Sequence, residues 1–307
     1  MILHYMTKKT LITLSGPTAS GKTSMAIRLA NLLNAEIFSC DSRQFYKEMT
    51  IGTAVPEKEE LEQVTHHFIQ HLSIHESYSV GKYEHDAIEA LNKYFNHKDI
   101  AILVGGSGLY MQAVTEGLDI FPDVSESIRT ELGERHRSYG LANLQEELKT
   151  LDPEYYKQVD LNNPSRVMRA LGVCLSSGKA YSSFLGKPKP KRPFQTFALT
   201  IDIQRDLLYN QINKRVDNMI TKGLIQEAHQ LYAFRNLNAL QTVGYKELFD
   251  FFDEKVSLDK AVSDIKQHTR NFAKRQLTWV RRKEQEAIKI KSNITNNELS
   301  ELFERMA

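Results

Sequence analysis

The 307-residue chain has little cysteine, a single tryptophan, almost no net charge and no long apolar run. Its two cysteines, Cys40 and Cys174, are too few for a disulfide framework or a four-cysteine metal site, which favours a reducing, cytoplasmic setting. No apolar stretch approaches the roughly 20 residues of a membrane span. The N-terminal MILHYMTKKT also lacks the order of segments seen in signal peptides. We therefore expect a cytoplasmic protein with no membrane partner.

The total charge gives no sign of a nucleic-acid binder. The chain has 40 Lys and Arg residues against 38 Asp and Glu residues, which leaves a formal net charge of +2. This balance excludes only a uniformly basic binder, so residues that bind RNA would have to be concentrated in one region. The length allows one large domain or two ordinary ones.

The first part of the chain alternates between two periodicities. Uncharged or weakly charged runs predict buried strands over 10–15, 36–40 and 100–104, whereas residues 22–33 and 79–95 show the spacing of amphipathic helices. Ser79 is a suitable N-cap for the second helix. Strands and helices in this order predict an α/β fold with a parallel sheet.

The pattern changes after residue 120. Residues 121–190 contain helical segments at 125–138, 141–150 and 164–177 without a convincing strand, and end in the proline-rich GKPKPKRP. A strand is expected again at 194–203, followed by helices over 205–222 and 258–287. We therefore predict a discontinuous catalytic core of residues 1–120 and 191–307, interrupted by an all-helical subdomain of residues 121–190.

A phosphate-binding loop connects the first strand to the first helix. The pattern G-x-x-x-x-G-K-[ST] is matched in full, and its strand–loop–helix context is the one that the motif requires. In such loops, backbone N–H groups and the helix N-terminus bind phosphate oxygens, Lys22 contacts the terminal phosphates and Thr23 binds Mg²⁺. The loop indicates a di- or triphosphate, which need not be a nucleotide. Its residues are Gly16, Pro17, Thr18, Ala19, Ser20, Gly21, Lys22 and Thr23.

A carboxylate follows the second strand but not the third. ATPases normally place a Mg²⁺-binding Asp at the end of a further apolar strand, yet residues 100–104 run into Gly105-Gly106-Ser107. Asp41 instead follows the strand at 36–40, which puts it at the carboxyl edge of the sheet where ligands bind. A role as base or metal ligand is favoured, although such an Asp can also cap the turn that follows it.

Several motifs together resemble one family, the bacterial tRNA dimethylallyltransferases, also called tRNA isopentenyltransferases. The resemblance implies a fold like that of P-loop NTPases with a helical insertion. It also implies transfer of a dimethylallyl group from dimethylallyl diphosphate to N6 of adenosine 37, beside the tRNA anticodon. The motifs are GPTASGKT at 16–23, DSRQFYKEMTIGTA at 41–54, GGSGLY at 105–110, NPSRVMRAL at 163–171, RVDNMITKGL at 215–224, TVGYKEL at 242–248 and RNFAKRQLTWVRR at 270–282.

The resemblance also implies roles for individual residues. Asp41 would act as the general base, while Lys22, Thr23 and Arg215 would stabilise the leaving diphosphate with Mg²⁺. Residues implied to contact the tRNA anticodon stem-loop are Asp41, Ser42, Arg43, Gln44, Ser107, Arg129, Ser165, Arg166, Val167, Met168 and Arg169. Many relatives have Gln where this chain has Ser165, which puts a base contact there in doubt.

Basic residues are concentrated in the last long helix. Residues 266–283 contain seven Lys or Arg residues and no Asp or Glu. Lys266, Arg270 and Lys274 share one helix face with Arg281, while Phe272, Ala273, Leu277 and Val280 can face the core. The basic face is either a solvated surface or a binding surface for the RNA backbone. We expect Trp279 to be packed, and solvated or capping roles for His66, His67 and His71.

Three other functions remain open at this point. A small-molecule kinase would share the phosphate loop. An enzyme that prenylates free adenine nucleotides would share both the loop and Asp41. A non-catalytic RNA-binding module would need neither the phosphate loop nor Asp41. The concentrated basic helix and the helical insertion favour tRNA as the acceptor. Nothing in the sequence indicates an oligomer, so a monomer is expected.

Overall fold

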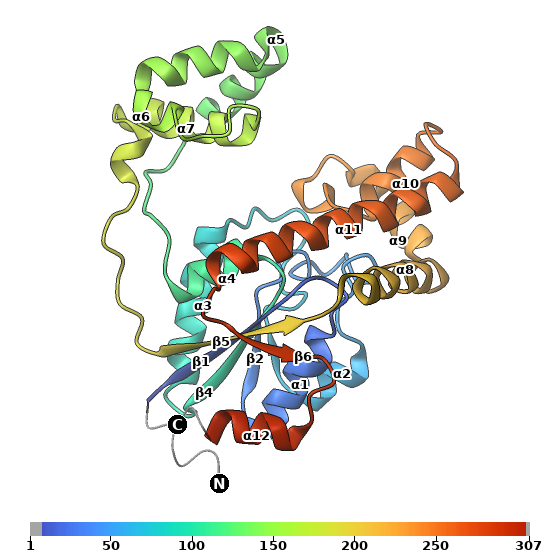
Figure 1. The fold of residues 1–307 in the computed structure, drawn as a ribbon. Helices are drawn as coiled ribbons and strands as arrows, with labels where there is room; N and C mark the ends of the chain where they lie inside the picture. Colours follow the sequence, from blue (N-terminus) through green and yellow to red (C-terminus); the bar gives the residue numbers. More distant parts are fainter. Residues whose placement is uncertain (1–7, 305–307) are drawn as a thin grey trace. The chain divides into compact units, whose positions relative to one another are not determined.

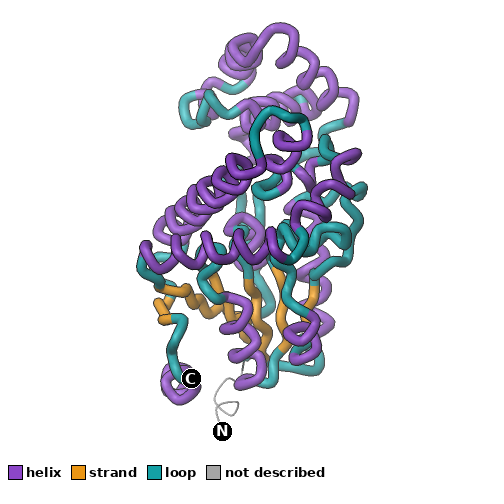
Figure 2. The backbone as a smooth tube through the Cα atoms, turned by 90° about the vertical axis from the view of Figure 1, so that its right-hand side faces the viewer, coloured by secondary structure: helices purple, strands orange, loops and turns teal. Residues whose placement is uncertain are grey.

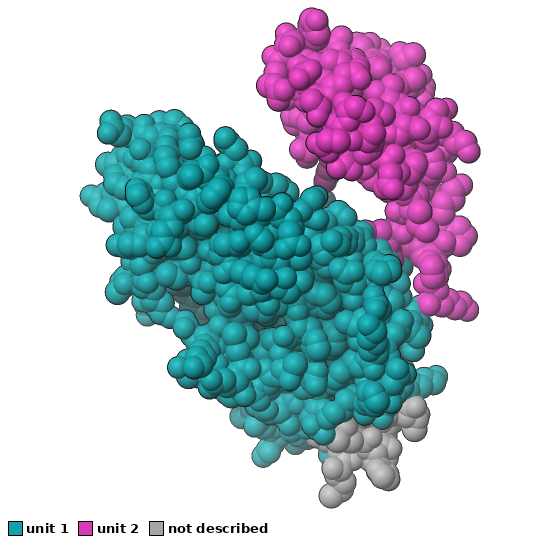
Figure 3. All heavy atoms as spheres, turned by 180° about the vertical axis from the view of Figure 1, so that it is seen from behind, with its two compact units in different colours: residues 1–116, 192–307 teal, residues 117–191 magenta. Residues whose placement is uncertain are grey.

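The computed structural model describes residues 8–304. Most of the N-terminal segment considered for a signal peptide lies outside this range. The chain divides into two compact units, shown in teal and magenta in Figure 3. The second unit is Gly117–Lys191, where the sequence led us to expect an insertion of residues 121–190, and the first unit contains the residues on both sides of it. Across the described range, no helix combines the length and the apolar character needed to cross a membrane.

The first unit is built on a six-stranded parallel sheet in the order β3-β2-β4-β1-β5-β6 (Figure 1). The fold is of the P-loop NTPase-like class expected from the sequence. Four strands were predicted to within one residue at each end. The strands are β1 (Thr10–Ser15), β2 (Glu36–Ser39), β3 (His66–His67), β4 (Ile100–Val104), β5 (Gln195–Asp202) and β6 (Ile288–Lys291).

Helices cover both faces of this sheet. One face of β1 and β4, with Ile12 and Ile102, packs against α1 and α12. The other face, with Leu11 and Leu103, packs against α3 and α4. The helices of this unit are α1 (Lys22–Leu33), α2 (Lys58–Gln63), α3 (Val80–Tyr94), α4 (Gly108–Thr115), α8 (Arg205–Thr221), α9 (Leu224–Leu231), α10 (Tyr245–Phe252), α11 (Leu258–Lys283) and α12 (Asn296–Glu304).

The end of α11 differs from the sequence prediction. A helix to residue 287 was expected, but α11 ends at Lys283 and the chain then enters β6, which pairs with β5. The Ser15 hydroxyl donates a hydrogen bond to the Glu284 carboxylate, which fixes this turn beside the end of β1. In Figure 1, α11 is the long helix that passes over the sheet, and Figure 2 shows the strands side by side in orange with helices in purple around them. Strand β6 escaped prediction because its sequence, IKIK, is short and half charged.

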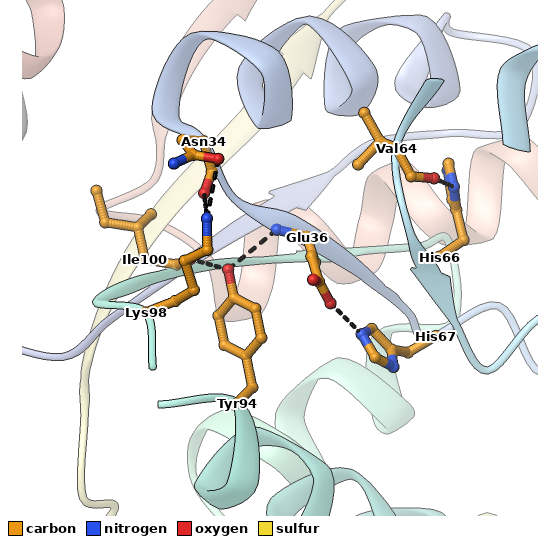
Figure 4. A network of polar contacts seen from close by, with 8 residues as sticks. All are labelled: Asn34, Glu36, Val64, His66, His67, Tyr94, Lys98 and Ile100. Carbon is orange, nitrogen blue, oxygen red and sulfur yellow. Dashed lines mark hydrogen bonds and ion pairs between the residues drawn. The ribbon is translucent and has the colours of Figure 1, made fainter. Parts of the chain in front are cut away.

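The short strand β3 was also not predicted. It consists of His66 and His67, for which solvated or capping roles were expected. His66 Nδ1 lies 2.8 Å from the Val64 carbonyl oxygen, and His67 Nε2 lies 2.7 Å from Glu36 Oε2 (Figure 4). Nearby, the Tyr94 hydroxyl donates to the Ile100 carbonyl at 2.7 Å. His67 therefore links β3 to β2 at the edge of the sheet, whereas the His66 contact is local to its own segment.

The second unit contains helices α5 (Glu126–Leu151), α6 (Pro153–Tyr156) and α7 (Pro164–Ser177) and a 3₁₀ turn at Tyr181–Phe184. The break expected between residues 138 and 141 is a kink at Gly140, which has a φ of 75°. α5 and α7 pack through a small apolar core that includes Leu144 and Leu171. Asp152 is fully buried and accepts hydrogen bonds from the Tyr155 amide and from the amide and hydroxyl of Ser182.

Candidate active site

The phosphate loop follows β1 and ends at the first turn of α1. Gly21 is the N-cap of α1 with a φ of 87°, a left-handed conformation that favours glycine. Within the described part of the chain, the buried Ser20 hydroxyl has no hydrogen-bond partner. A buried polar group of this kind is costly unless a ligand or water satisfies it. The loop is therefore built to receive a polar group.

Two cations lie beside this loop, Lys22 at the start of α1 and Arg215 on α8. Lys22 Nζ donates to the Pro17 carbonyl at 2.7 Å, and Arg215 Nη1 donates to Thr18 Oγ1 at 3.0 Å. Burial is the main cause that lowers the pKa of Lys22 to about 8; the Asp41 carboxylate opposes this shift and the Arg215 guanidinium adds to it. Burial also lowers the pKa of Arg215, again opposed by Asp41. Both shifts indicate positive charge that a bound anion would stabilise.

Asp41 follows β2, and its position is compatible with both roles considered from the sequence: capping the next turn, and acting as a base or metal ligand. Its Oδ1 accepts a hydrogen bond from the Arg43 amide at 3.1 Å, so the carboxylate caps the following turn. Asp41 also lines two cavities, of about 880 Å³ and about 350 Å³. The cap uses one carboxylate oxygen, which leaves lone pairs on the carboxylate for a substrate.

The two cavities meet at three residues that line both, Thr18, Asp41 and Arg215. The smaller cavity is also lined by the phosphate loop, including Lys22 and Thr23, by residues between β2 and β3, including Glu60 on α2, and by the end of β4. The larger is lined by the segments that follow β2 and β4 and by parts of α8, α10 and α11. The site therefore offers an anion-binding compartment and a roomier compartment, with a carboxylate between them.

The oxygen atoms around the phosphate loop suit Mg²⁺. The side chains of Thr23, Ser39 and Asp41 line the smaller cavity, and Mg²⁺ prefers oxygen ligands. No group of three or more His, Cys, Asp or Glu residues that could hold a metal ion is found in the described range. Mg²⁺ commonly needs only one or two protein oxygens together with phosphate oxygens and water. The donor set fits a metal that binds together with a diphosphate.

The segments after β2 and β4 are joined by two serines. The Ser42 amide donates to Ser107 Oγ at 3.3 Å, and the two hydroxyl oxygens lie 3.2 Å apart. Arg43 Nη1 donates to the carbonyls of Asn238 and Ala239, and Gln44 Nε2 donates to those of Thr53 and Ala54. Thus Ser42, Arg43 and Ser107 line the larger cavity, whereas Gln44 lines the smaller one.

The other residues implied to contact tRNA belong to the second unit and line neither cavity. Arg129 is exposed on α5, and Ser165, Arg166 and Arg169 are exposed on α7. Val167 is fully buried in the core of this unit, and Met168 packs against that core. The Val167 side chain therefore packs within the unit, and tRNA contact by the stretch at 165–169 stays a prediction.

Sequence reasoning missed several residues that line the larger cavity. They include Gln241, Thr242, Val243, Gly244 and Lys246, which precede or begin α10, and Arg275 and Gln276 on α11. The TVGYKEL motif at 242–248 was the sequence signal that could have indicated the residues around the start of α10.

Phe272 was expected in the core but is 38% exposed and also lines the larger cavity. Trp279 packs on Gly108, where a Cβ atom would lie 2.2 Å from its ring, but it is half-buried and also lines this cavity, so the choice between packing and base stacking stays open.

The basic residues of α11 do not form one continuous surface. Lys266 Nζ lies 2.5 Å from Asp217 Oδ1, and Arg270 Nη1 donates to Asn213 Oδ1 at 2.7 Å, so both are engaged with α8. Lys274 and Arg281 instead line a separate cavity of about 300 Å³ together with Arg205 and Lys289. None of these four forms an ion pair with a described residue.

The parallel sheet, the strand–loop–helix motif and the carboxylate at the adjoining strand end define a P-loop-type protein with a site suited to a ligand that carries phosphates. The comparisons with known proteins specify the class further. A model of the IPP transferase family matches residues 44–283. The chain therefore belongs to the IPP transferase family and is a prenyltransferase.

Relatives with curated names support this assignment over almost the whole chain. A tRNA dimethylallyltransferase from Christiangramia forsetii is 55% identical over 272 residues, which cover 89% of this chain and 90% of the relative. One from Flavobacterium psychrophilum is 52% identical over 280 residues, covering 89% of this chain and 91% of the relative.

Solved structures agree with the sequence relatives. The tRNA isopentenylpyrophosphate transferase from Bacillus halodurans matches with a TM-score of 0.71 and 34% identity, covering 97% of this chain and 96% of that one. A eukaryotic dimethylallyltransferase acting on tRNA matches with a TM-score of 0.79 and 25% identity, covering 93% of this chain and 74% of that one.

Proposed function

We propose that this chain transfers a dimethylallyl group from dimethylallyl diphosphate to N6 of adenosine 37 in tRNA, forming N6-(dimethylallyl)adenosine and releasing diphosphate. The observation that carries the proposal is the meeting of two cavities at Thr18, Asp41 and Arg215. One compartment suits a diphosphate and the other is large enough for a nucleobase. The relatives' names supply the prenyl donor class and the tRNA acceptor.

The donor diphosphate occupies the smaller cavity in this proposal. The phosphate-loop amides, Lys22 and Arg215 bind its oxygens, and Thr23 would hold Mg²⁺. Mg²⁺ would supply further neutralisation of the diphosphate charge. As the bond between the allylic carbon and oxygen breaks, negative charge grows on the bridging oxygen, so these cations stabilise the transition state more than the ground state. No γ-phosphoryl transfer occurs, which explains why β4 needs no carboxylate at its end.

The acceptor adenine occupies the larger cavity, next to Asp41. A base in an anticodon loop can be extruded at a cost of a few kcal/mol, because no duplex has to be melted. Its exocyclic amine is a poor nucleophile because the lone pair is delocalised into the ring. The new N6–carbon bond forms as the carbon–oxygen bond breaks, and Asp41 accepts the proton that N6 loses. Such general-base assistance is typically worth about 10² to 10⁴ in rate.

The anticodon stem-loop contacts basic residues outside the two cavities that meet at Asp41. Arg129 and Arg166 are exposed on the second unit, and Lys274 and Arg281 on α11 form no ion pair with a described residue. Backbone binding by such residues releases counterions, so binding weakens steeply as salt increases. The enzyme would act as a monomer in the cytoplasm, where its tRNA substrates are found.

Two acceptors and a change of donor separate this proposal from its alternatives. The protein is incubated with dimethylallyl diphosphate and Mg²⁺ together with unmodified tRNA or AMP, and separately with ATP in place of the prenyl donor. Prenylation of tRNA but not AMP is the expected result. Prenylation of AMP alone would indicate an enzyme acting on free nucleotides, and ATP consumption without prenyl transfer would indicate a kinase.

A further inference from the structure

Gln276 is a buried amide on a helix that is otherwise rich in charge. Its side chain is 8% exposed and lies between the phosphate loop and the segment that follows β4. We propose that Gln276 is a positioning residue that fixes the donor side of the active site relative to the acceptor side. This inference rests on the proposed function, because it concerns the geometry of that reaction.

Both ends of the Gln276 amide are used. Its Oε1 accepts a hydrogen bond from the Thr18 amide at 2.8 Å, and its Nε2 donates to the Gly106 carbonyl at 2.9 Å. The bridge needs one acceptor and one donor at this spacing, which a glutamine amide provides and a carboxylate does not. A glutamate here would place a charged oxygen against the Gly106 carbonyl oxygen.

The contact with the segment after β4 depends on the absence of a side chain there. A Cβ atom at Gly106 would lie 2.1 Å from Gln276 Nε2. Real contacts of that kind do not occur, so any side chain at position 106 would displace the amide. Trp279, about one helical turn further along α11, packs on Gly108 in the same way. Two glycines of the GGSG sequence thus allow α11 to approach the site closely.

Thr18 and Gly106, the two residues bound by Gln276, are each next to a group proposed to take part in the reaction. On the donor side, Thr18 lines both cavities and its hydroxyl accepts a hydrogen bond from Arg215. On the acceptor side, Gly106 precedes Ser107, which holds the Ser42 amide next to Asp41. Gln276 therefore links the cationic diphosphate site to the loop that carries the base. A shift of about 1 Å between reacting groups can cost about 10²-fold in rate.

The test compares Gln276→Leu and Gln276→Glu with Gln267→Leu. Gln267 is exposed on the same helix and lines neither cavity, so it is a matched control. For both Gln276 variants we expect kcat for tRNA prenylation to fall by at least about 10-fold, while KM for tRNA changes by less than about 3-fold. The control should retain wild-type kcat. A merely structural role would lower the melting temperature and leave the kcat of the folded fraction unchanged.

Hydrogen exchange of the phosphate loop gives a second measurement that does not depend on activity. Because Gln276 holds the Thr18 amide, exchange in a peptide that covers residues 16–19 should be faster in Gln276→Leu than in wild type or Gln267→Leu. Wild-type kcat in both Gln276 variants, or unchanged exchange in this peptide, would overturn the inference. If wild-type protein transfers no prenyl group but the exchange difference is observed, the proposed function fails while the bridge itself stands.

Discussion

Arg215 on α8 donates a hydrogen bond to the Thr18 hydroxyl over 3.0 Å, at the junction of the two cavities. The interaction holds a cation beside both the proposed diphosphate site and Asp41. Removal of one such group from a developing negative charge typically costs about 10² to 10³ in kcat. We expect Arg215→Ala to lower kcat by about that factor in steady-state prenylation assays. Lys214, which is exposed on the same helix, serves as the control, and Lys214→Ala should behave as wild type.

Asp41→Asn separates the two roles of this side chain. The asparagine Oδ1 can still accept the hydrogen bond from the Arg43 amide, so the turn remains capped, but the base is removed. We expect kcat to fall by at least about 10², with tRNA affinity nearly unchanged. Asp41→Ala should reduce kcat at least as much. Near-normal turnover in either purified variant would remove Asp41 from the mechanism.

Lys22 should make donor binding depend on pH. Its pKa of about 8 lies below the ordinary value of 10.5, so the free enzyme loses this charge as the pH rises through 8. A bound diphosphate favours the charged form and raises the pKa again. We expect KM for dimethylallyl diphosphate to increase above pH 8. Binding slightly above that pH should also take up a proton, which calorimetry in buffers of different ionisation enthalpy measures.

The variant Lys22→Arg tests this assignment, because an arginine stays charged throughout this range. It should bind the donor without proton uptake, even if its turnover is lower. Equal proton uptake by wild type and Lys22→Arg would assign the effect to another group. Without ligand, the unfolded chain binds more protons at Lys22 between pH 8 and 10.5, so this residue makes the free energy of unfolding rise with pH there.

The basic residues of α11 should differ in their contribution to RNA binding. Lys274 and Arg281 form no ion pair with a described residue, so their replacement by alanine should weaken tRNA binding. The slope of log Kd against log salt should fall by about one for each phosphate-binding side chain that is removed. Lys266→Ala should have a much smaller effect, because Lys266 is already paired with Asp217. Filter binding at several salt concentrations measures these slopes, and equal slopes for wild type and the Lys274/Arg281 double variant would exclude this surface.

Periodicity and motif together predicted the strands and helices that place Asp41 and the phosphate loop at one edge of the sheet. Local sequence was sufficient there because buried parallel strands and amphipathic helices have distinct spacing. The roles of α11 residues could not be predicted in the same way. That Lys266 pairs with α8, that Phe272 faces a cavity and that Gln276 bridges two loops depend on how distant segments pack. The periodicity of a single helix indicates which of its faces is apolar, but it does not indicate which distant residues that helix contacts.

The central claim is that one adenosine beside the anticodon receives the dimethylallyl group at N6. Unmodified tRNA is incubated with the protein, dimethylallyl diphosphate and Mg²⁺, then cleaved by nucleases and characterised by mass spectrometry of the resulting fragments and nucleosides. We expect a single N6-(dimethylallyl)adenosine at position 37, formed by wild type and strongly reduced in Asp41→Asn. Absence of the adduct, or its formation on another base, would rule out the proposed transfer.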